Sequence, residues 1–285
     1  MNNYRNQWRA LSIPFRTISF GFDRQFYIHS EKFSGGLYIV NDKSGPAGLT
    51  VNKLYLSFAW HKTINGNNFH GGIQGGMVFK NFSMDNLTFP NQFDMTIGYF
   101  NSEIANNEEN FRLNTNYPDL NLGLAWSKKL RFFEPELGIA VFHLTMPKEA
   151  FFESNNRLPL RAGLTGGLNI PIKKFYAHPQ FLYMLQSNAS EFIGGAEIGY
   201  NIPKANIIRQ IFIGCFARND FTTSFDATIA EIGLQFKQLR LGFSYDINNS
   251  PLKVATNKRG AFEVSLIYIS KSTIPQKVTL PCDRY

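Results

Sequence analysis

The sequence lacks a long apolar segment. We find no run of about 18 apolar residues, the length that a membrane-spanning helix needs, and the mean hydropathy is −0.20. The chain opens Met-Asn-Asn-Tyr-Arg, without the basic and apolar regions of a secretory signal peptide. The missing apolar run excludes a helical membrane protein. It does not exclude a β-barrel, in which interior polar residues dilute the lipid-facing ones.

Residues that hold metals or form catalytic nucleophiles are few. Cys215 and Cys282 lack the spacing of metal ligands, and both unpaired thiols and a disulfide between them stay open. The histidines lie one per segment, without metal-ligand spacing, at His29, His61, His70, His143 and His178. No Gly-x-Ser-x-Gly elbow is present. The sequence therefore predicts no enzyme activity, no metal and no cofactor.

Clustered positive charge is also lacking. The net charge is +8, from 29 basic and 21 acidic residues. The Lys and Arg residues are scattered along the chain and many lie in expected turns, whereas a nucleic-acid interface needs a basic patch. We therefore expect no nucleic-acid partner.

What the chain does contain is alternation of apolar and polar residues. The clearest case has apolar residues at Leu239, Leu241, Phe243, Tyr245 and Ile247, with mostly polar residues between them. The pattern recurs at 120–127 and 262–269. Alternation places every second side chain on one face of a strand. With 28 Phe and 12 Tyr, it predicts an all-β transmembrane barrel, and a soluble all-β protein of two packed sheets is the alternative.

About thirteen strands are expected, at 13–28, 33–41, 52–62, 69–80, 119–127, 132–143, 160–170, 175–186, 191–200, 207–218, 225–236, 239–247 and 260–269. The connections after the odd strands are short, and one contains Asn65-Gly66, a hairpin turn signal. Those after the even strands are mostly longer. Outer-membrane barrels have short periplasmic turns and long external loops, so this difference orients the chain.

An odd strand number conflicts with that orientation. Bacterial barrels have an even number of strands, and thirteen would place Met1 on the cell exterior. We therefore expect a native barrel of fourteen strands whose signal peptide and most of whose first strand precede this sequence. The barrel would occupy 1–269, and 270–285 would form a periplasmic tail.

Several charged residues fall at positions that face the barrel interior. They are Glu191, Glu197, Arg240, Asp246 and Glu263. We expect them to pair across strands rather than to form a selectivity ring. Gly71-Gly72 and Gly75-Gly76 lie within an expected strand, so we interpret them as relief of crowding and not as a phosphate-binding loop.

Three segments are candidates for partner binding. Asp42 and Lys43 begin a segment with turn chemistry, which is a simple turn or an external loop that meets a partner. Phe93 and Tyr99 alternate with polar residues inside the longest irregular stretch, 81–119, which predicts either a hairpin arm above the barrel or an inward-folded plug. Arg284 and Tyr285 end an extended tail that is a frayed end or a dock for periplasmic machinery.

Short stretches in family order resemble the PorP/SprF outer-membrane proteins of Bacteroidota, which act in type IX secretion and gliding motility. They are Tyr4-Arg5-Asn6-Gln7-Trp8, 36–46, Tyr117-Pro118-Asp119, Ala177-His178-Pro179, 242–248, 261–266 and Pro281-Cys282-Asp283-Arg284-Tyr285. The ordered set carries the resemblance, which covers essentially the whole chain. The tail departs slightly, because the family often has Cys-Pro-Arg where this chain has Cys-Asp-Arg.

The resemblance implies a non-enzymatic barrel in the outer membrane. Such a barrel would work with the type IX secretion machinery to export or anchor a secreted surface protein, for example a gliding adhesin, and would recognise its C-terminal domain. The partners implied are that cargo, the secretion machinery and outer-membrane lipid. An independent porin or small-molecule transporter is the alternative function.

Overall fold

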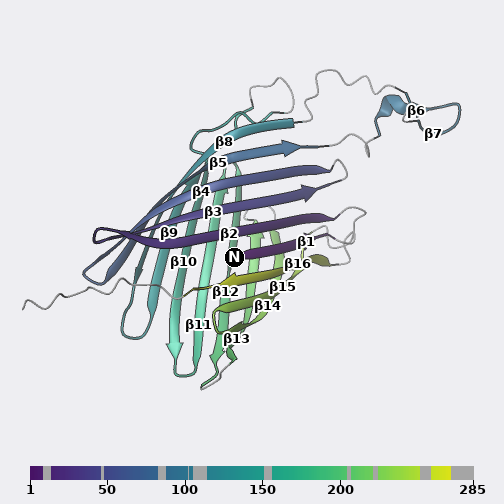
Figure 1. The fold of residues 1–285 in the computed structure, drawn as a ribbon. Helices are drawn as coiled ribbons and strands as arrows, with labels where there is room; N and C mark the ends of the chain where they lie inside the picture. The colour runs from purple at the N-terminus through teal and green to yellow at the C-terminus, as the bar shows by residue number, and fades with distance from the viewer. Residues whose placement is uncertain are drawn as a thin grey trace, which may run out of the picture.

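The computed structural model describes residues 1–8, 14–45, 48–82, 88–101, 103–104, 114–150, 156–203, 207–220, 224–250 and 258–270. Fourteen antiparallel strands close into one barrel (Figure 1). The barrel strands are β1 Asn2–Gln7, β2 Phe15–Ile28, β3 Glu31–Ser44, β4 Leu49–Ile64, β5 Asn67–Asn81, β8 Asn114–Lys128, β9 Glu134–Phe142, β10 Arg161–Ile172, β11 Phe175–Gln186, β12 Ala189–Asn201, β13 Ile208–Asp220, β14 Ser224–Phe236, β15 Leu239–Asn248 and β16 Arg259–Tyr268. A 3₁₀ turn, η1 Pro90–Gln92, precedes a separate two-stranded sheet of β6 Phe93–Asp94 and β7 Tyr99–Phe100.

The first strand closes the barrel. β1 pairs with β2 on one side and with β16 on the other, so that Arg5 lies opposite both Thr17 and Glu263. The prediction of a fourteen-stranded barrel is thus confirmed, but its fourteenth strand lies within this sequence, at Asn2–Gln7. Sequence periodicity missed β1 because it has no apolar face. Its residues are almost all polar, on the outer as well as the inner side.

All thirteen strands predicted from alternation are present, and several are longer than predicted. β3 continues to Ser44 and β4 begins at Leu49, so the expected connection 42–51 is reduced to 45–48. Asp42, predicted to lie in a turn, pairs with Thr17 of β2 and accepts a hydrogen bond from its hydroxyl. The ladder extends beyond the apolar band of the wall. There neither face contacts lipid, so alternation stops before the hydrogen bonding does.

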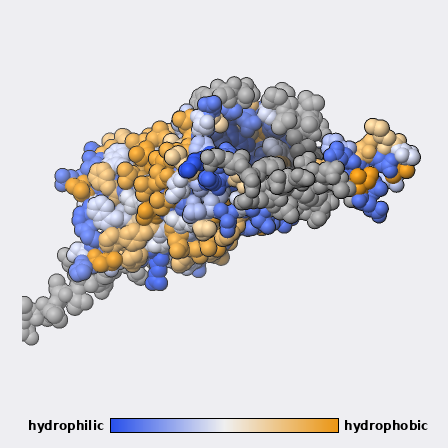
Figure 2. Space-filling view, turned by 90° about the horizontal axis from the view of Figure 1, so that it is seen from above, coloured by the Kyte–Doolittle hydropathy of each residue, from blue (hydrophilic) through white to orange (hydrophobic). Residues whose placement is uncertain are grey.

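The two faces of the wall differ sharply in chemistry. On β4, Leu54, Leu56 and Phe58 point outward, and Leu56 is 66% exposed. Lys53 and Tyr55, which alternate with these residues along the strand, point inward. Figure 2 shows hydrophobic residues gathered over the outer wall and hydrophilic ones toward its ends. An apolar outer band of this size is covered by lipid in a transmembrane barrel. Within the described ranges, no helix is long and apolar enough to cross a membrane.

The two ends of the barrel carry different connections. The short-turn end carries 29–30, 65–66, 129–133, 173–174, 202–207 and 237–238. The long-connection end carries 8–14, 45–48, 82–113, 143–160, 187–188, 221–223 and 249–258. Asn65 and Gly66 both have positive φ, 49° and 76°, which suits the tight hairpin predicted for this pair. The expected contrast between short and long connections is therefore present.

Candidate functional site

Most charged side chains that point into the lumen are paired. Arg240 of β15 forms an ion pair with Glu197 of β12, which also accepts a hydrogen bond from Tyr176 of β11. The Arg240 guanidinium lies 3.8 Å from the centre of the Phe212 ring, which adds a cation–π contact. This layer joins β11, β12, β13 and β15 along the inner side of the wall, so the prediction that interior charges pair across strands is confirmed for Arg240 and Glu197.

A second charge cluster lies where the first and last strands meet. The Asp246 carboxylate is buried and its Oδ2 accepts from Arg5 at 2.7 Å and from Arg218 at 2.9 Å. Arg5 also pairs with Glu263 at 3.1 Å, and Arg218 with Asp226 at 3.0 Å. The cluster connects β1, β13, β14, β15 and β16. It therefore ties the closing strand to its neighbours through charge-assisted hydrogen bonds. The prediction that interior charges pair across strands is confirmed for Asp246 and for Glu263, each of which pairs with Arg5.

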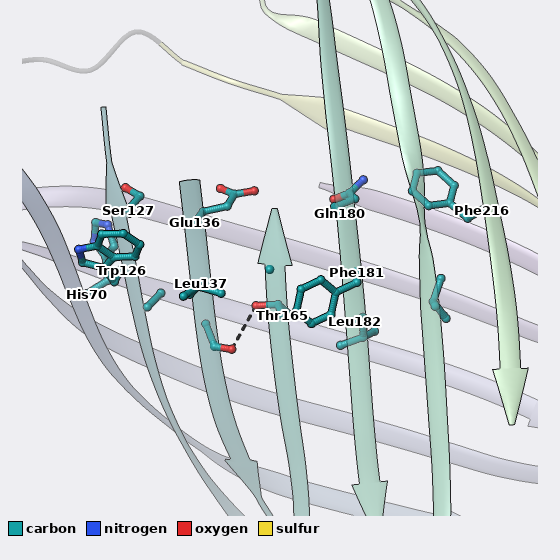
Figure 3. Close-up of a pocket in the computed structure, with 14 residues that line it drawn as sticks. His70, Trp126, Ser127, Glu136, Leu137, Thr165, Gln180, Phe181, Leu182 and Phe216 are labelled. Carbon is teal, nitrogen blue, oxygen red and sulfur yellow. Dashed lines mark hydrogen bonds between the residues drawn. The ribbon is translucent and has the colours of Figure 1, made fainter. Parts of the chain in front are cut away.

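A cavity of about 490 Å³ lies on the inner side of the wall formed by β5 and β8 to β13. Figure 3 shows Glu136, Gln180 and Phe216 along its lining, which β5 and β8 to β13 supply. The Glu136 carboxylate lies 2.9 Å from Nε2 of His178. The lining mixes apolar and polar groups, and it holds no arrangement of nucleophile and base of the kind that hydrolases use.

Two histidines on neighbouring strands of one hairpin contact each other at the short-turn end. His61 and His70 are paired across β4 and β5, with their Nδ1 atoms 2.7 Å apart, and Ser34 Oγ lies 2.9 Å from His61 Nε2. The two-residue turn at Asn65-Gly66 sets the register of this hairpin and so places His61 opposite His70. In the part of the chain that the structure describes, no group of three or more His, Cys, Asp or Glu residues could hold a metal ion.

The connection between β9 and β10 folds into the lumen at the long-connection end. Its Leu158 packs against a cluster of inward-facing side chains on β4, β5 and β8, namely Val51, Tyr55, Val78 and Tyr117. Glu149 of the same connection pairs with Lys80 and accepts a hydrogen bond from Tyr117 at 3.4 Å. An inward plug is one alternative for 81–119. Among the described residues, those that fold inward belong instead to the β9–β10 connection, at 143–150 and 156–160.

A buried polar network fixes the start of this inward segment. Asp119 of β8 accepts from Tyr55 at 2.7 Å and lies 2.9 Å from Nδ1 of His143. Asn121 accepts from the His143 backbone at 3.0 Å. His143 has φ 62°, a left-handed conformation that turns the chain away from β9. The network therefore directs the connection across the lumen rather than away from it.

Replacing Glu149 by alanine is expected to release the inward segment. The change removes the carboxylate that joins Lys80 and Tyr117 to the connection, and it leaves Lys80 without an ion-pair partner, which is unfavourable in a half-buried position. We expect limited proteolysis within 143–160 to become several-fold faster. Lys148→Ala is the control, because its neighbouring side chain is exposed. Equal cleavage rates in both variants would show that the contacts of Glu149 with Lys80 and Tyr117 do not hold this segment in place.

The separate hairpin of β6 and β7 lies beyond the ends of β5 and β8, apart from the barrel wall (Figure 1). Phe93 pairs with Phe100, and their ring centres lie 5.2 Å apart. Met95 is 91% exposed and Tyr99 is 60% exposed. The hairpin alternative for this stretch is therefore the one observed, and the hairpin presents apolar side chains to solvent.

The structure places the predicted partner-binding residues in three separate regions. Phe93 and Tyr99 lie on the two strands of the hairpin. Asp42 and Lys43 lie near the end of β3 in the barrel wall, where Asp42 bonds to Thr17. Arg284 and Tyr285 lie outside the described residues, as does Cys282. Cys215 points outward from β13 as a free, exposed thiol.

Sequence reasoning missed Arg5, Asp119 and Glu149 as interior groups. Arg5 could have been found from the requirement for an even strand number, which demands another strand near the start of the chain. Glu149 lies in an irregular connection, where no periodicity indicates which way a side chain points.

The comparison of this chain with curated proteins gives no match. Among solved structures, two mutant forms of the Rh. blastica porin align with 94% of this chain and 98% of their own, at 6% identity. Their TM-scores of 0.35 and 0.34 are too low to support an argument about function. The family model described as "Type IX secretion system membrane protein PorP/SprF" matches residues 1–268, which include every barrel strand. The chain therefore belongs to the PorP/SprF family of type IX secretion system membrane proteins.

Proposed function

We propose that this outer-membrane barrel is a non-enzymatic partner of the type IX secretion machinery that exports or anchors a secreted surface protein. The observation that carries the proposal is the family match over residues 1–268. In this proposal the cargo is recognised through its C-terminal domain, the host is a Bacteroidota-like bacterium, and a gliding adhesin is one example of such a cargo.

The interior supports a binding role over free diffusion of solutes. Ion pairs such as Arg240–Glu197 place charged side chains in the lumen near the short-turn end. At the other end, Glu149 and Leu158 of the β9–β10 connection lie against inward-facing side chains of β4, β5 and β8. Both groups reduce the open space of the lumen at its ends, whereas the connections stay available for a partner.

The β6–β7 hairpin is the proposed contact with cargo. With long connections on the cell exterior, the hairpin projects outward and exposes Met95, Tyr99 and Phe100. Exposed aromatic and methionine side chains in one place favour a protein-binding surface. Asp42 and Lys43 are a second, weaker candidate at the same end. Arg284 and Tyr285 stay a prediction for the periplasmic side.

The test is purification of the full-length, tagged protein from its native outer membrane in mild detergent, followed by mass spectrometry of the proteins that co-purify. We expect a secreted surface protein or components of the secretion machinery at near-equal amounts. Recovery of the barrel alone would overturn the proposal.

The hairpin contact has its own test. A double variant, Met95→Asp with Tyr99→Ala, is expected to reduce co-purified cargo at least ten-fold, because it removes the most exposed apolar groups of the hairpin and adds a charge. The control is Phe132→Ser, which removes an aromatic side chain that is 67% exposed at the opposite end of the barrel. Equal cargo recovery from both variants would place the contact elsewhere.

An independent porin is the second candidate function, and the luminal cavity of about 490 Å³ is the observation that favours it. Reconstitution in a planar bilayer separates the two functions. Stable, open-pore conductance from the purified barrel supports the porin, and its absence supports the partner role.

A further inference from the structure

One luminal arginine lacks a carboxylate partner. Arg161, the first residue of β10, points inward opposite Phe142, and its guanidinium lies 5.0 Å from the centre of that ring. Its Nε is buried and has no hydrogen-bond partner. Among the described residues it forms no ion pair, unlike Arg5, Arg218 and Arg240, which all have carboxylate partners.

A cavity of about 480 Å³ adjoins this guanidinium at the long-connection end. It lies away from the inner faces of β4, β5 and β8 that the segment 143–160 covers. Its lining is largely polar. It includes Gln7, Gln186 and Ser190, and also three acidic residues, Glu191, Asp220 and Asp226. Arg218 also lines it, but that guanidinium is already bound by Asp226 and Asp246. Arg161 is therefore the cation of this cavity that is available to a ligand.

A second cation reinforces Arg161. Lys53 points inward from β4 and lies within electrostatic range of Arg161 and Lys80. Lys80 is neutralised by Glu149, whereas Lys53 has no ion-pair partner in the described part of the chain. Asp119 and Asp42 also lie within electrostatic range of Lys53 and offset part of the repulsion between the two cations. An anion bound at Arg161 would offset more of it.

We propose that Arg161 forms an oxyanion-binding site in this cavity at the long-connection end of the lumen, for a carboxylate or a phosphate group, and that Lys53, outside the cavity, adds longer-range electrostatic attraction. Guanidinium groups bind both oxyanions through paired N–H donors. Glu191 lines the same cavity and opposes a simple anion by its negative charge, so it tunes the affinity. The site does not depend on the cargo proposed above.

The test is isothermal titration of the purified full-length barrel in detergent with sodium phosphate and, separately, sodium acetate, at ionic strength held constant with sodium chloride. We expect saturable binding of at least one oxyanion. Binding of both shows a general oxyanion site, and binding of one identifies the chemical group. No binding of either would overturn the proposal.

Two variants that are expected to change the oxyanion affinity in opposite directions locate the site. Arg161→Gln is expected to lower the affinity at least ten-fold, and Glu191→Gln to raise it several-fold. Lys32→Gln is the matched control, because it removes an inward-facing cation at the short-turn end, and it should leave the affinity unchanged. An equal loss of affinity in Lys32→Gln would show that the oxyanion responds only to the overall positive charge of the lumen, and it would overturn the proposed site.

Stability separates a binding role from a structural one. If Arg161 only supports the fold, Arg161→Gln should lower the urea midpoint of unfolding. We expect the midpoint to stay the same or rise, because an unpaired charge is removed. If this variant fails to fold, Lys53→Gln serves in its place and should lower the affinity several-fold. Unchanged affinity in that variant would overturn the proposal.

Discussion

Alanine at position 76 is expected to prevent stable closure of the barrel wall between β4 and β5. Gly76 points inward directly opposite Tyr55. A Cβ there would lie 2.1 Å from the Leu54 carbonyl oxygen and 2.5 Å from Cδ1 of Tyr55. The carbonyl belongs to a hydrogen-bonded ladder, and Tyr55 is held by Asp119 at 2.7 Å. Neither neighbour can move freely, so we expect a loss of about 3 kcal/mol or more in the free energy of unfolding.

The neighbouring glycine is the control for this prediction. A Cβ on Gly75 would point outward and meet only Leu120 Cδ1, at 3.8 Å, an ordinary van der Waals distance. Gly75→Ala should therefore behave like the unmodified protein. Urea unfolding in detergent and the heat-dependent shift in gel mobility measure both variants. Similar stability of Gly76→Ala and Gly75→Ala would show that the wall can relax around the added methyl group.

Removal of the Asp246 carboxylate is expected to weaken the seam where β1 joins the end of the chain. Asp246 is buried, and one of its oxygens accepts from both Arg5 and Arg218. Asp246→Ala would leave two partly buried guanidinium groups without this partner. Breaking a buried ion pair from one side costs about 3–5 kcal/mol. We expect the urea midpoint to fall accordingly and β1 to exchange its amide hydrogens faster than β4.

Asp226→Ala is the matched control for Asp246→Ala. It also removes a carboxylate bound to Arg218, but the Asp226 side chain is 44% exposed. Exposed ion pairs contribute about 0–1 kcal/mol, so this variant should be close to the unmodified protein. Equal losses in the two variants would mean that burial of Asp246 is not what stabilises the seam.

These two positions differ in how visible they are in the sequence. The alternation around Asp246 predicts an inward charge, and the structure confirms it. The glycines at 75 and 76 look equivalent in the sequence. Only the pairing of Gly76 with Tyr55 distinguishes the crowded position from the free one. Crowding arises between strands, and the register between strands is not a local property of either one.

The sequence by itself determined the barrel class, thirteen of its strands and, where the alternation is clear, which face of a strand points inward. It did so because a lipid-facing wall imposes a period of two along every strand that crosses the bilayer. The same rule fails where no lipid is contacted. It missed β1, whose residues are almost all polar, and it ended β3 before Ser44.

Only the tertiary structure decided what fills the barrel. Strand register brings His61 to His70 and leaves Arg161 without a carboxylate, and closure brings Arg5 to Asp246. The path of 143–160 into the lumen depends on Asp119, His143 and Glu149 meeting groups from other strands. Apart from His61 and His70, which lie on one hairpin, these contacts join residues far apart in the chain. They form only once the wall has curved and closed, so local pattern carries no signal for them.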